Sequence, residues 1–330
     1  MKKICYILVA LFVGMQLQSC SKDDDVKTVS ELEEKYFTIE NAEYFEGNFP
    51  EATTSEKLQG VDMSNQVMNG AMNYVTVVTE QKVSKFYLAA KEVEGYYEYI
   101  PDEKSADDEA YSSYVIPVMM SQSYSGNSTM MLSGELEDGT VTKPVETELT
   151  YIETKVGALE VKLSFSNSKD IDLHLYTPSD EHIYFGNRGG TYVNDNGEEI
   201  SYGLDVDSNA GCNIDNINKE NIYIPEELVE DGVYTVVVDM YSNCNSSIAT
   251  SWSIVTRYQG ELITPVEGSN PASGVYPIGA RSGDHTFVMS FRITKAGTRS
   301  YMIPDIKSSW KFIPAPLRES DLNKLDLLED

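Results

Sequence analysis

Apolar and polar residues alternate along most of the chain in short runs, with a period of two residues. Val, Tyr, Thr and Met dominate these runs, and Gly, Asn, Asp and Ser separate them, which is typical of strands joined by turns. A first series of predicted strands covers Met72–Thr79, Ser84–Ala90, Tyr96–Ile100, Ser113–Met120, Ser128–Leu132 and Thr147–Thr154. A second series covers Ala158–Ser166, Asp170–Pro178, His182–Gly186, Val233–Tyr241, Ser251–Arg257, Thr286–Thr294 and Ser309–Ile313. The pattern predicts an all-β chain built from two β-sandwich domains.

The boundary between the two domains is indicated by a change in composition. Residues 135–146 are mostly polar and include Gly139 and Pro144. We therefore predict an N-terminal β-sandwich over residues 36–153 and a C-terminal β-sandwich over residues 154–330. Near the C-terminus, three leucines share one side of a short predicted helix, namely Leu322, Leu325 and Leu328. We expect this helix to cap an edge of the second domain, and a partner-binding tail is the alternative.

The N-terminus carries the features of an export signal. Lys2 and Lys3 precede an apolar run, Ile4–Val13, that is shorter than the roughly 20 residues a membrane-spanning helix needs. The following Leu-Gln-Ser-Cys, ending at Cys20, resembles the lipobox of bacterial lipoproteins. We expect residues 1–19 to be a signal peptide and Cys20 to be lipidated. A plain signal peptide with an unrelated cysteine is the alternative.

An acidic tether is predicted over residues 20–35. Its run of three aspartates, residues 23–25, resembles the surface-export signal of lipoproteins in certain Gram-negative bacteria. A solvated linker accounts for the same charges, and the two interpretations are compatible. We predict an outer-membrane lipoprotein held by its N-terminal lipid and displayed at the cell surface.

Net charge narrows the classes of partner. The 330 residues contain 53 acidic and 25 basic side chains, which gives a formal charge of −28. Such a chain repels phosphate, so we exclude a nucleic-acid binder that works through a basic field. An extracellular protein or glycan ligand stays compatible with the composition.

Four cysteines are present, and two of them are assigned to the N-terminal region. Cys5 belongs to the signal peptide and Cys20 to the lipid anchor. In an exported chain the remaining pair, Cys212 and Cys244, most simply forms a disulfide. Neither has a neighbouring Cys or His at a spacing typical of zinc sites.

The second domain contains the most informative motifs of the chain. Asp170–Tyr176 alternates so that Ile171, Leu173 and Leu175 share one face and the polar residues share the other. Four more motifs follow in order: I-Y-F-G-N from Ile183, L-D-V-D-S-N from Leu204, E-N-I-Y from Glu220 and G-V-Y-T-V from Gly232. This order resembles the YfaP-like family of uncharacterised bacterial exported domains. The resemblance covers about residues 169–244 and implies a compact β-sandwich, akin to pre-peptidase domains, with no established activity.

Several oxygen-bearing side chains lie within these motifs, and they suit a hard cation. They are Asp170, Asp172, Asp205, Asp207 and Asn209. Clustered carboxylates repel one another unless a cation, hydrogen bonds or protons compensate them, and Ca²⁺ takes six to eight oxygen ligands. We therefore predict a structural Ca²⁺ site, which is not an EF-hand because Ala210 and Asn216 replace its glycine and bidentate acid. The alternative is that backbone amides, tyrosine hydroxyls or solvent satisfy these groups.

Enzyme signatures are weak, and we predict a non-enzymatic binding or structural protein. The sequence contains no G-x-S-x-G, H-E-x-x-H or phosphate-binding loop. His174 and Asp172 are neighbours on one strand face, but His182 and His285 have no partners close in sequence. A hydrolase, or an accessory domain of one, is the alternative.

Tyrosines of the first domain suggest a second alternative, a glycan-capture accessory protein. They are Tyr96, Tyr97, Tyr99, Tyr111 and Tyr114. Aromatic rings flanked by carboxylates suit sugar binding, and Tyr also serves at protein interfaces. Packing within the sheet explains the same residues, since Tyr has a high preference for strands.

Overall fold

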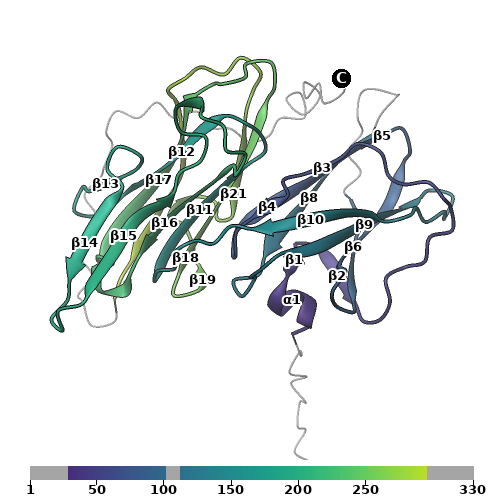
Figure 1. Cartoon of the computed structure of the whole chain (residues 1–330), viewed down its shortest axis with the longest axis horizontal. Coiled ribbons are helices and arrows are strands. Elements are labelled where there is room, and N and C mark those ends of the chain that lie inside the picture. The colour runs from purple at the N-terminus through teal and green to yellow at the C-terminus, as the bar shows by residue number, and fades with distance from the viewer. Residues whose placement is uncertain (1–28, 102–111, 296–330) are drawn as a thin grey trace, which may run out of the picture.

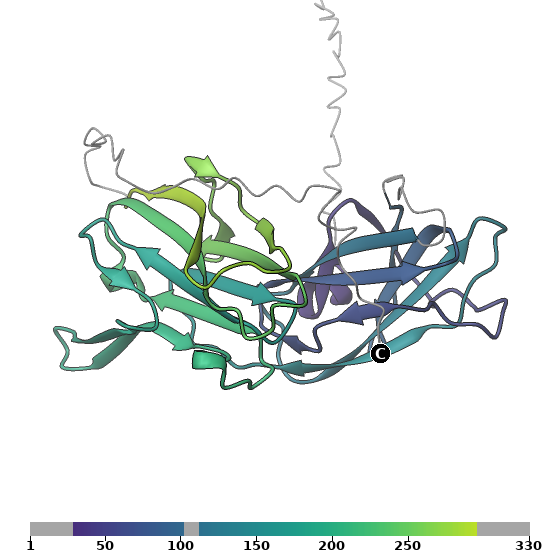
Figure 2. The same cartoon turned by 90° about the horizontal axis from the view of Figure 1, so that it is seen from above.

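The computed structural model describes residues 29–101 and 112–295 and is almost entirely β. Two β-sandwiches lie side by side, the first in purple to blue and the second in teal to yellow-green (Figures 1 and 2). The prediction of an all-β sandwich fold is confirmed. The predicted signal peptide, Cys20, Tyr111, the strand Ser309–Ile313 and the C-terminal helix lie outside the described residues.

Two sheets make up the first sandwich. One has the strand order β1 (Phe37–Ile39), β8 (Ser112–Met120), β5 (Met72–Thr79) and β3 (Val61–Met63). The other has the order β2 (Ala42–Phe45), β7 (Tyr96–Tyr99), β6 (Val83–Ala90), β9 (Ser128–Leu136), β10 (Val145–Tyr151) and β4 (Gln66–Val67). The pairing is antiparallel except between β10 and β4. Alternating apolar side chains of both sheets, including Phe86 and Val118, fill the space between them.

Two further sheets make up the second sandwich. The first has the order β14 (Gly189–Val193), β15 (Glu199–Val206), β16 (Lys219–Ile224), β11 (Leu159–Phe165), β18 (Thr250–Tyr258) and β19 (Glu261–Leu262), and β21 (Ala272–Tyr276) also pairs with β18. The second has the order β13 (His182–Ile183), β12 (Asp170–Tyr176), β17 (Gly232–Ser242), β22 (Asp284–Ile293) and β20 (Glu267–Gly268). Two 3₁₀ turns, η1 (Ala210–Cys212) and η2 (Glu226–Leu228), interrupt the loops.

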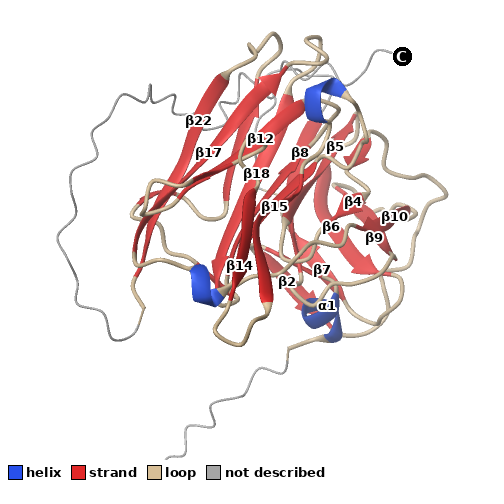
Figure 3. Cartoon of the chain, turned by 60° about the vertical axis from the view of Figure 1, so that its left-hand side comes forward, coloured by secondary structure: helices blue, strands red, loops and turns tan. Residues whose placement is uncertain are grey.

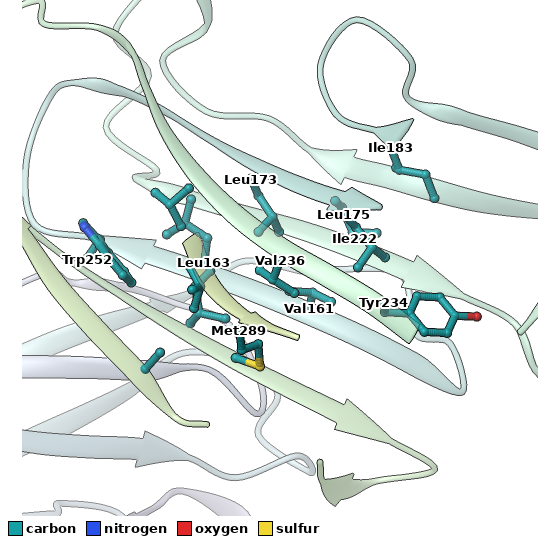
Figure 4. Close-up of a cluster of buried hydrophobic side chains, with 14 of the residues drawn as sticks. Val161, Leu163, Leu173, Leu175, Ile183, Ile222, Tyr234, Val236, Trp252 and Met289 are labelled. Atoms are coloured by element: carbon teal, nitrogen blue, oxygen red, sulfur yellow. The ribbon is translucent and has the colours of Figure 1, made fainter. Parts of the chain in front are cut away.

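The core of the second sandwich is continuous and apolar (Figure 4). Leu173 and Leu175 of β12 face Val161 and Leu163 of β11 across the space between the sheets. At one end of this core, the ring of Tyr234 stacks on Phe291 at a centroid distance of 5.2 Å. The predicted apolar face of β12 therefore packs inward, which turns its polar residues to the outer face of the sheet.

The first domain begins earlier than the sequence predicts. A short helix, α1 (Glu31–Lys35), follows the N-cap Ser30 and is closed by a capping box with Glu33. Leu32 is fully buried in the first core. The end of the predicted tether is therefore part of the domain, as the helix labelled α1 in Figure 3. Within the described residues, no helix is long and apolar enough to cross a membrane.

The two sandwiches meet through polar side chains. Ser253 of β18 donates to the carbonyl oxygen of Met72 in β5 at 2.9 Å. Lys162 of β11 is 2% exposed and donates to Asn69 of the first domain at 3.2 Å. These contacts bury the outer face of β11, and its inner face lies in the core of the second sandwich. All seven residues of this strand are therefore buried.

Lys219 is the most deeply buried cation of this contact, and its replacement provides a test of the contact. Its Nζ lies 3.3 Å from Oγ of Ser64 beside a cavity of about 50 Å³, and burial lowers its pKa to about 7. Lys219→Met is expected to stabilise the chain by roughly 2–3 kcal/mol at pH 7, because it removes a desolvated amine.

The pH dependence of this gain follows from the lowered pKa of Lys219. Between pH 7 and the usual lysine pKa of 10.5, the unfolded chain holds a proton that the folded chain does not. The stability of the parent chain therefore rises with pH in this range, and the advantage of Lys219→Met shrinks. Urea unfolding at pH 7 and pH 9.5 measures the difference, and a variant that is less stable at pH 7 would contradict it.

Candidate metal centre

Strand β12 carries polar side chains on its outer face, yet these side chains are buried. Asp170, Asp172 and His174 are only 1%, 2% and 5% exposed. Asp170 lies against the turn at η1, where the backbone N–H of Gly211 donates to it, whereas His174 is covered by the hairpin that follows β12. In this hairpin, the rings of His182 and Tyr184 stack on each other at 3.9 Å, and both stack on His174. The outer face of β12 is therefore an enclosed polar site.

Three carboxyl groups meet at the edge where the two sheets of this sandwich approach each other. Asp172 comes from β12, Asp207 follows β15, and Glu220 comes from β16. One oxygen from each lies within 4.8 Å of the others. The side chain of Glu220 extends from β16 to β12 of the other sheet, where its Oε2 accepts a 2.6 Å hydrogen bond from the backbone N–H of Leu173. That N–H is free to bond because β13 pairs only with the last two residues of β12.

One oxygen of each carboxyl group in this cluster has no hydrogen-bond donor. The cluster also includes Asp170 and Asp239, whose charges act on Asp172. Each of its five members has one buried oxygen that accepts no hydrogen bond from the residues that the structure describes: Asp170 Oδ1, Asp172 Oδ2, Asp207 Oδ1, Glu220 Oε1 and Asp239 Oδ1. Buried polar atoms are normally paired. Asp239 Oδ1 has Nδ1 of His285 at 3.4 Å, whereas the other four oxygens require another partner.

Burial and mutual repulsion raise the carboxyl pKa values. Burial, with the charges of Asp170, Asp207 and Asp239, raises the pKa of Asp172 to about 8. Burial and the charge of Asp172 raise the pKa of Glu220 well above its usual value. The charge of Arg188, at 2.9 Å, opposes the rise for Asp207. A divalent cation would relieve both causes, because it replaces the lost hydration and offsets the like charges.

Two of the predicted ligands, Asp205 and Asn209, do not face the carboxyl cluster. Asp205 accepts hydrogen bonds at 2.6 Å from the backbone N–H of Lys155 and from the side chain of Asn221. A β-bulge between Leu204 and Val206 breaks the alternation that would have placed Asp205 beside Asp207. The structure brings together Asp170, Asp172 and Asp207 but not Asp205.

Asn209 organises a turn and has no free ligand atom. Its Nδ2 donates to the carbonyl oxygen of Lys169 and to Asn218, at 2.9 and 2.8 Å. Its Oδ1 accepts from the backbone N–H groups of Asp215 and Asn216, at 3.0 and 3.3 Å. These four bonds use the full capacity of the amide, so Asn209 holds the loop in place rather than facing the cluster.

The predicted disulfide is confirmed, and it borders the site. Cys212 and Cys244 are bonded, with Cα atoms 5.6 Å apart. The adjacent Gly211 donates its backbone N–H to Oδ2 of Asp170 at 2.7 Å. The disulfide thereby ties η1, and with it the position of Asp170, to the end of β17.

All three histidines of the chain gather on the outer face of the second sheet. Nδ1 of His174 lies 2.8 Å from Nε2 of His182, and Nδ1 of His285 lies 3.4 Å from Oδ1 of Asp239. The cross-strand register Asp172–Asp239–His285 runs over β12, β17 and β22. Sequence reasoning missed Glu220, Asp239 and this gathering. The one available signal was a lone acid, Asp239, within the apolar run of β17.

Neither the protein-family models nor the curated proteins contain a match to this chain.

Proposed function

We propose that the second sandwich is a divalent-cation-binding domain that holds Ca²⁺ at Asp172, Asp207 and Glu220. The observation that carries this proposal is the set of buried carboxylate oxygens without hydrogen-bond donors at one edge of the sandwich. Asp170 belongs to the same set and was expected from the sequence. Three to four carboxylates provide only oxygen ligands, which favours a hard cation over a thiophilic metal.

Ca²⁺ suits this site better than Mg²⁺. The carboxylates come from β12, the end of β15 and β16, so their spacing is set by the packing of two sheets. Ca²⁺ accepts six to eight oxygens in flexible geometry, whereas Mg²⁺ demands a near-ideal octahedron and keeps several waters. The bound ion would join the two sheets at their open edge, which is a stabilising role.

The wider role we propose is a non-enzymatic binding or structural module displayed at the cell surface. The lipobox-like sequence ending at Cys20 supports anchorage by lipid in the outer membrane. The order of motifs resembling YfaP-like exported domains supports an extracytoplasmic role for the second sandwich. The cation would keep the displayed domain folded.

Two alternatives receive less support. A hydrolase needs an open site, but the ring of His174 is buried beneath His182 and Tyr184. Glycan capture was expected to use the tyrosines of the first domain, but Tyr97 lies in the first core and Tyr99 packs against it.

Calorimetric titration of the EDTA-treated chain with Ca²⁺ tests the proposal. We expect saturable binding that is lost in Asp172→Asn and kept in Asp205→Asn, because only Asp172 has an oxygen facing the cluster. Circular dichroism of both variants verifies their folding. Equal loss of Ca²⁺ binding in the two variants would contradict the assignment, as would an absence of binding in the parent chain.

A further inference from the structure

A second set of ligand atoms lies beside the oxygen site and includes a nitrogen. Asp172, His174 and Asp239 each present an atom within 4.8 Å of the other two. Asp172 and Asp239 are direct cross-strand partners on β12 and β17, and His174 lies two residues along β12. We propose that this set binds a first-row transition-metal dication, with Zn²⁺ as the preferred ion, next to the Ca²⁺ position.

The orientation of His174 supports a metal ligand. Its ring is buried, and Nδ1 lies 2.8 Å from Nε2 of His182. When Nδ1 donates to His182, the lone pair of His174 Nε2 points toward Asp239, whose Oδ2 is 3.9 Å away. Nε2 has no hydrogen-bond partner in the described part of the chain. A buried lone pair facing a carboxylate is unfavourable unless a cation lies between them, and a bond at the other ring nitrogen is the usual way to orient a metal-binding histidine.

The charge of the cluster supports two ions rather than one. Five buried carboxyl groups carry five negative charges when ionised, and Arg188 compensates the charge of Asp207. Four negative charges then remain. One dication at the oxygen site would balance about half of this charge, whereas two dications would balance all of it. Asp172 belongs to both sets, and its two oxygens allow one carboxylate to bridge the two ions.

The ligand types separate the two positions. An imidazole nitrogen with two carboxylates suits Zn²⁺, Mn²⁺ or Fe²⁺, whereas Ca²⁺ favours oxygen alone. His285 lies 3.4 Å from Asp239 and has a side chain that is 47% exposed. This residue would orient Asp239 and marks the side of the sheet from which an ion can enter.

The experiment is a Zn²⁺ titration of the oxidised, EDTA-treated chain in the presence of saturating Ca²⁺, with bound metals counted by mass spectrometry. We expect one equivalent of each ion. His174→Gln should weaken Zn²⁺ binding by more than about 100-fold, since loss of a group behind a ligand alone weakens binding by 10–100-fold. The same variant should keep its Ca²⁺ response. Glu220→Gln should lose the Ca²⁺ response and keep its Zn²⁺ binding. Replacement of the exposed Glu199 by Gln should change neither the Ca²⁺ response nor Zn²⁺ binding.

A second measurement needs no variant. Only three histidines are present, so their side-chain ¹⁵N signals in the parent chain are few, and Zn²⁺ should shift Nε2 of His174. An unshifted signal, or Zn²⁺ binding that is unchanged in His174→Gln, would overturn the proposal. The inference shares Asp172 with the proposed Ca²⁺ site, but the two are separable. Zn²⁺ binding without any Ca²⁺ response would refute only the proposed function. A Ca²⁺ response without Zn²⁺ binding would refute only this inference.

Discussion

Replacing Glu220 by Gln is expected to make the cation-free protein more stable and to abolish its stabilisation by Ca²⁺. The glutamine retains an oxygen that accepts the N–H of Leu173, while it removes a buried charge that repels Asp172. We expect a gain of roughly 1–3 kcal/mol at pH 7 without cation, because burial and the charge of Asp172 disfavour the ionised carboxylate that the unfolded chain holds in water. With Ca²⁺ at 1,000 times its dissociation constant, the parent chain should gain about 4 kcal/mol and the variant almost nothing.

The opposite signs of these two effects distinguish a cation site from ordinary packing. A residue with only a structural role would destabilise the chain when replaced, whether or not Ca²⁺ is present. Glu160→Gln is the matched control, because Glu160 is another buried glutamate of the same sandwich, on β11. This control should leave the Ca²⁺ response unchanged. A loss of stability in cation-free Glu220→Gln would argue that the parent glutamate is satisfied by the protein itself.

Removing the disulfide is expected to weaken both the fold and the proposed site. Cys212 and Cys244 enclose 31 residues, which include all of β16 and β17. For a loop of this length, the chain-entropy model gives a loss of about 3–4 kcal/mol in the Cys212→Ser, Cys244→Ser double variant. The melting temperature should fall by roughly 6–16 °C, given 2–4 °C per kcal/mol for a domain of this size.

The same double variant should also bind Ca²⁺ more weakly, because Gly211 in the adjacent turn holds Asp170. Calorimetry in EDTA and in Ca²⁺ measures both effects on one sample. Replacing only the exposed Ser247 of the loop after Cys244 is a control that should change neither value. A variant that melts at the parent temperature would show that the folded second domain does not depend on this bond.

Strands with a strong pattern of their own could be predicted from the sequence. Met72–Thr79 agrees with β5 at both ends, and the inward face of β12 was correctly assigned. The short strands β1 and β2 were missed because they contain only three and four residues. Such strands are held by pairing with longer neighbours that lie far away in the sequence, which a local pattern does not report.

The site could be predicted only in part, for a similar reason. The D-x-D motif located Asp170 and Asp172, but Glu220 and Asp239 join them through packing between sheets and cross-strand register. The bulge in β15 that redirects Asp205 has no clear sequence signal. Lys162 of β11 likewise resembles a solvent-facing residue until the first domain covers it.

The most direct measurement is a thermal melt of the oxidised chain from Ser21 onward, first in EDTA and then in increasing Ca²⁺, with Mg²⁺ in parallel. Binding to the folded state alone raises the melting temperature in proportion to the logarithm of free ligand above its dissociation constant. We predict a clear rise with Ca²⁺, a much smaller one with Mg²⁺, and no rise in Asp172→Ala. Identical melting curves in EDTA and millimolar Ca²⁺ would contradict the central claim, because the buried carboxyl groups of Asp172, Asp207 and Glu220 would then be compensated without a cation.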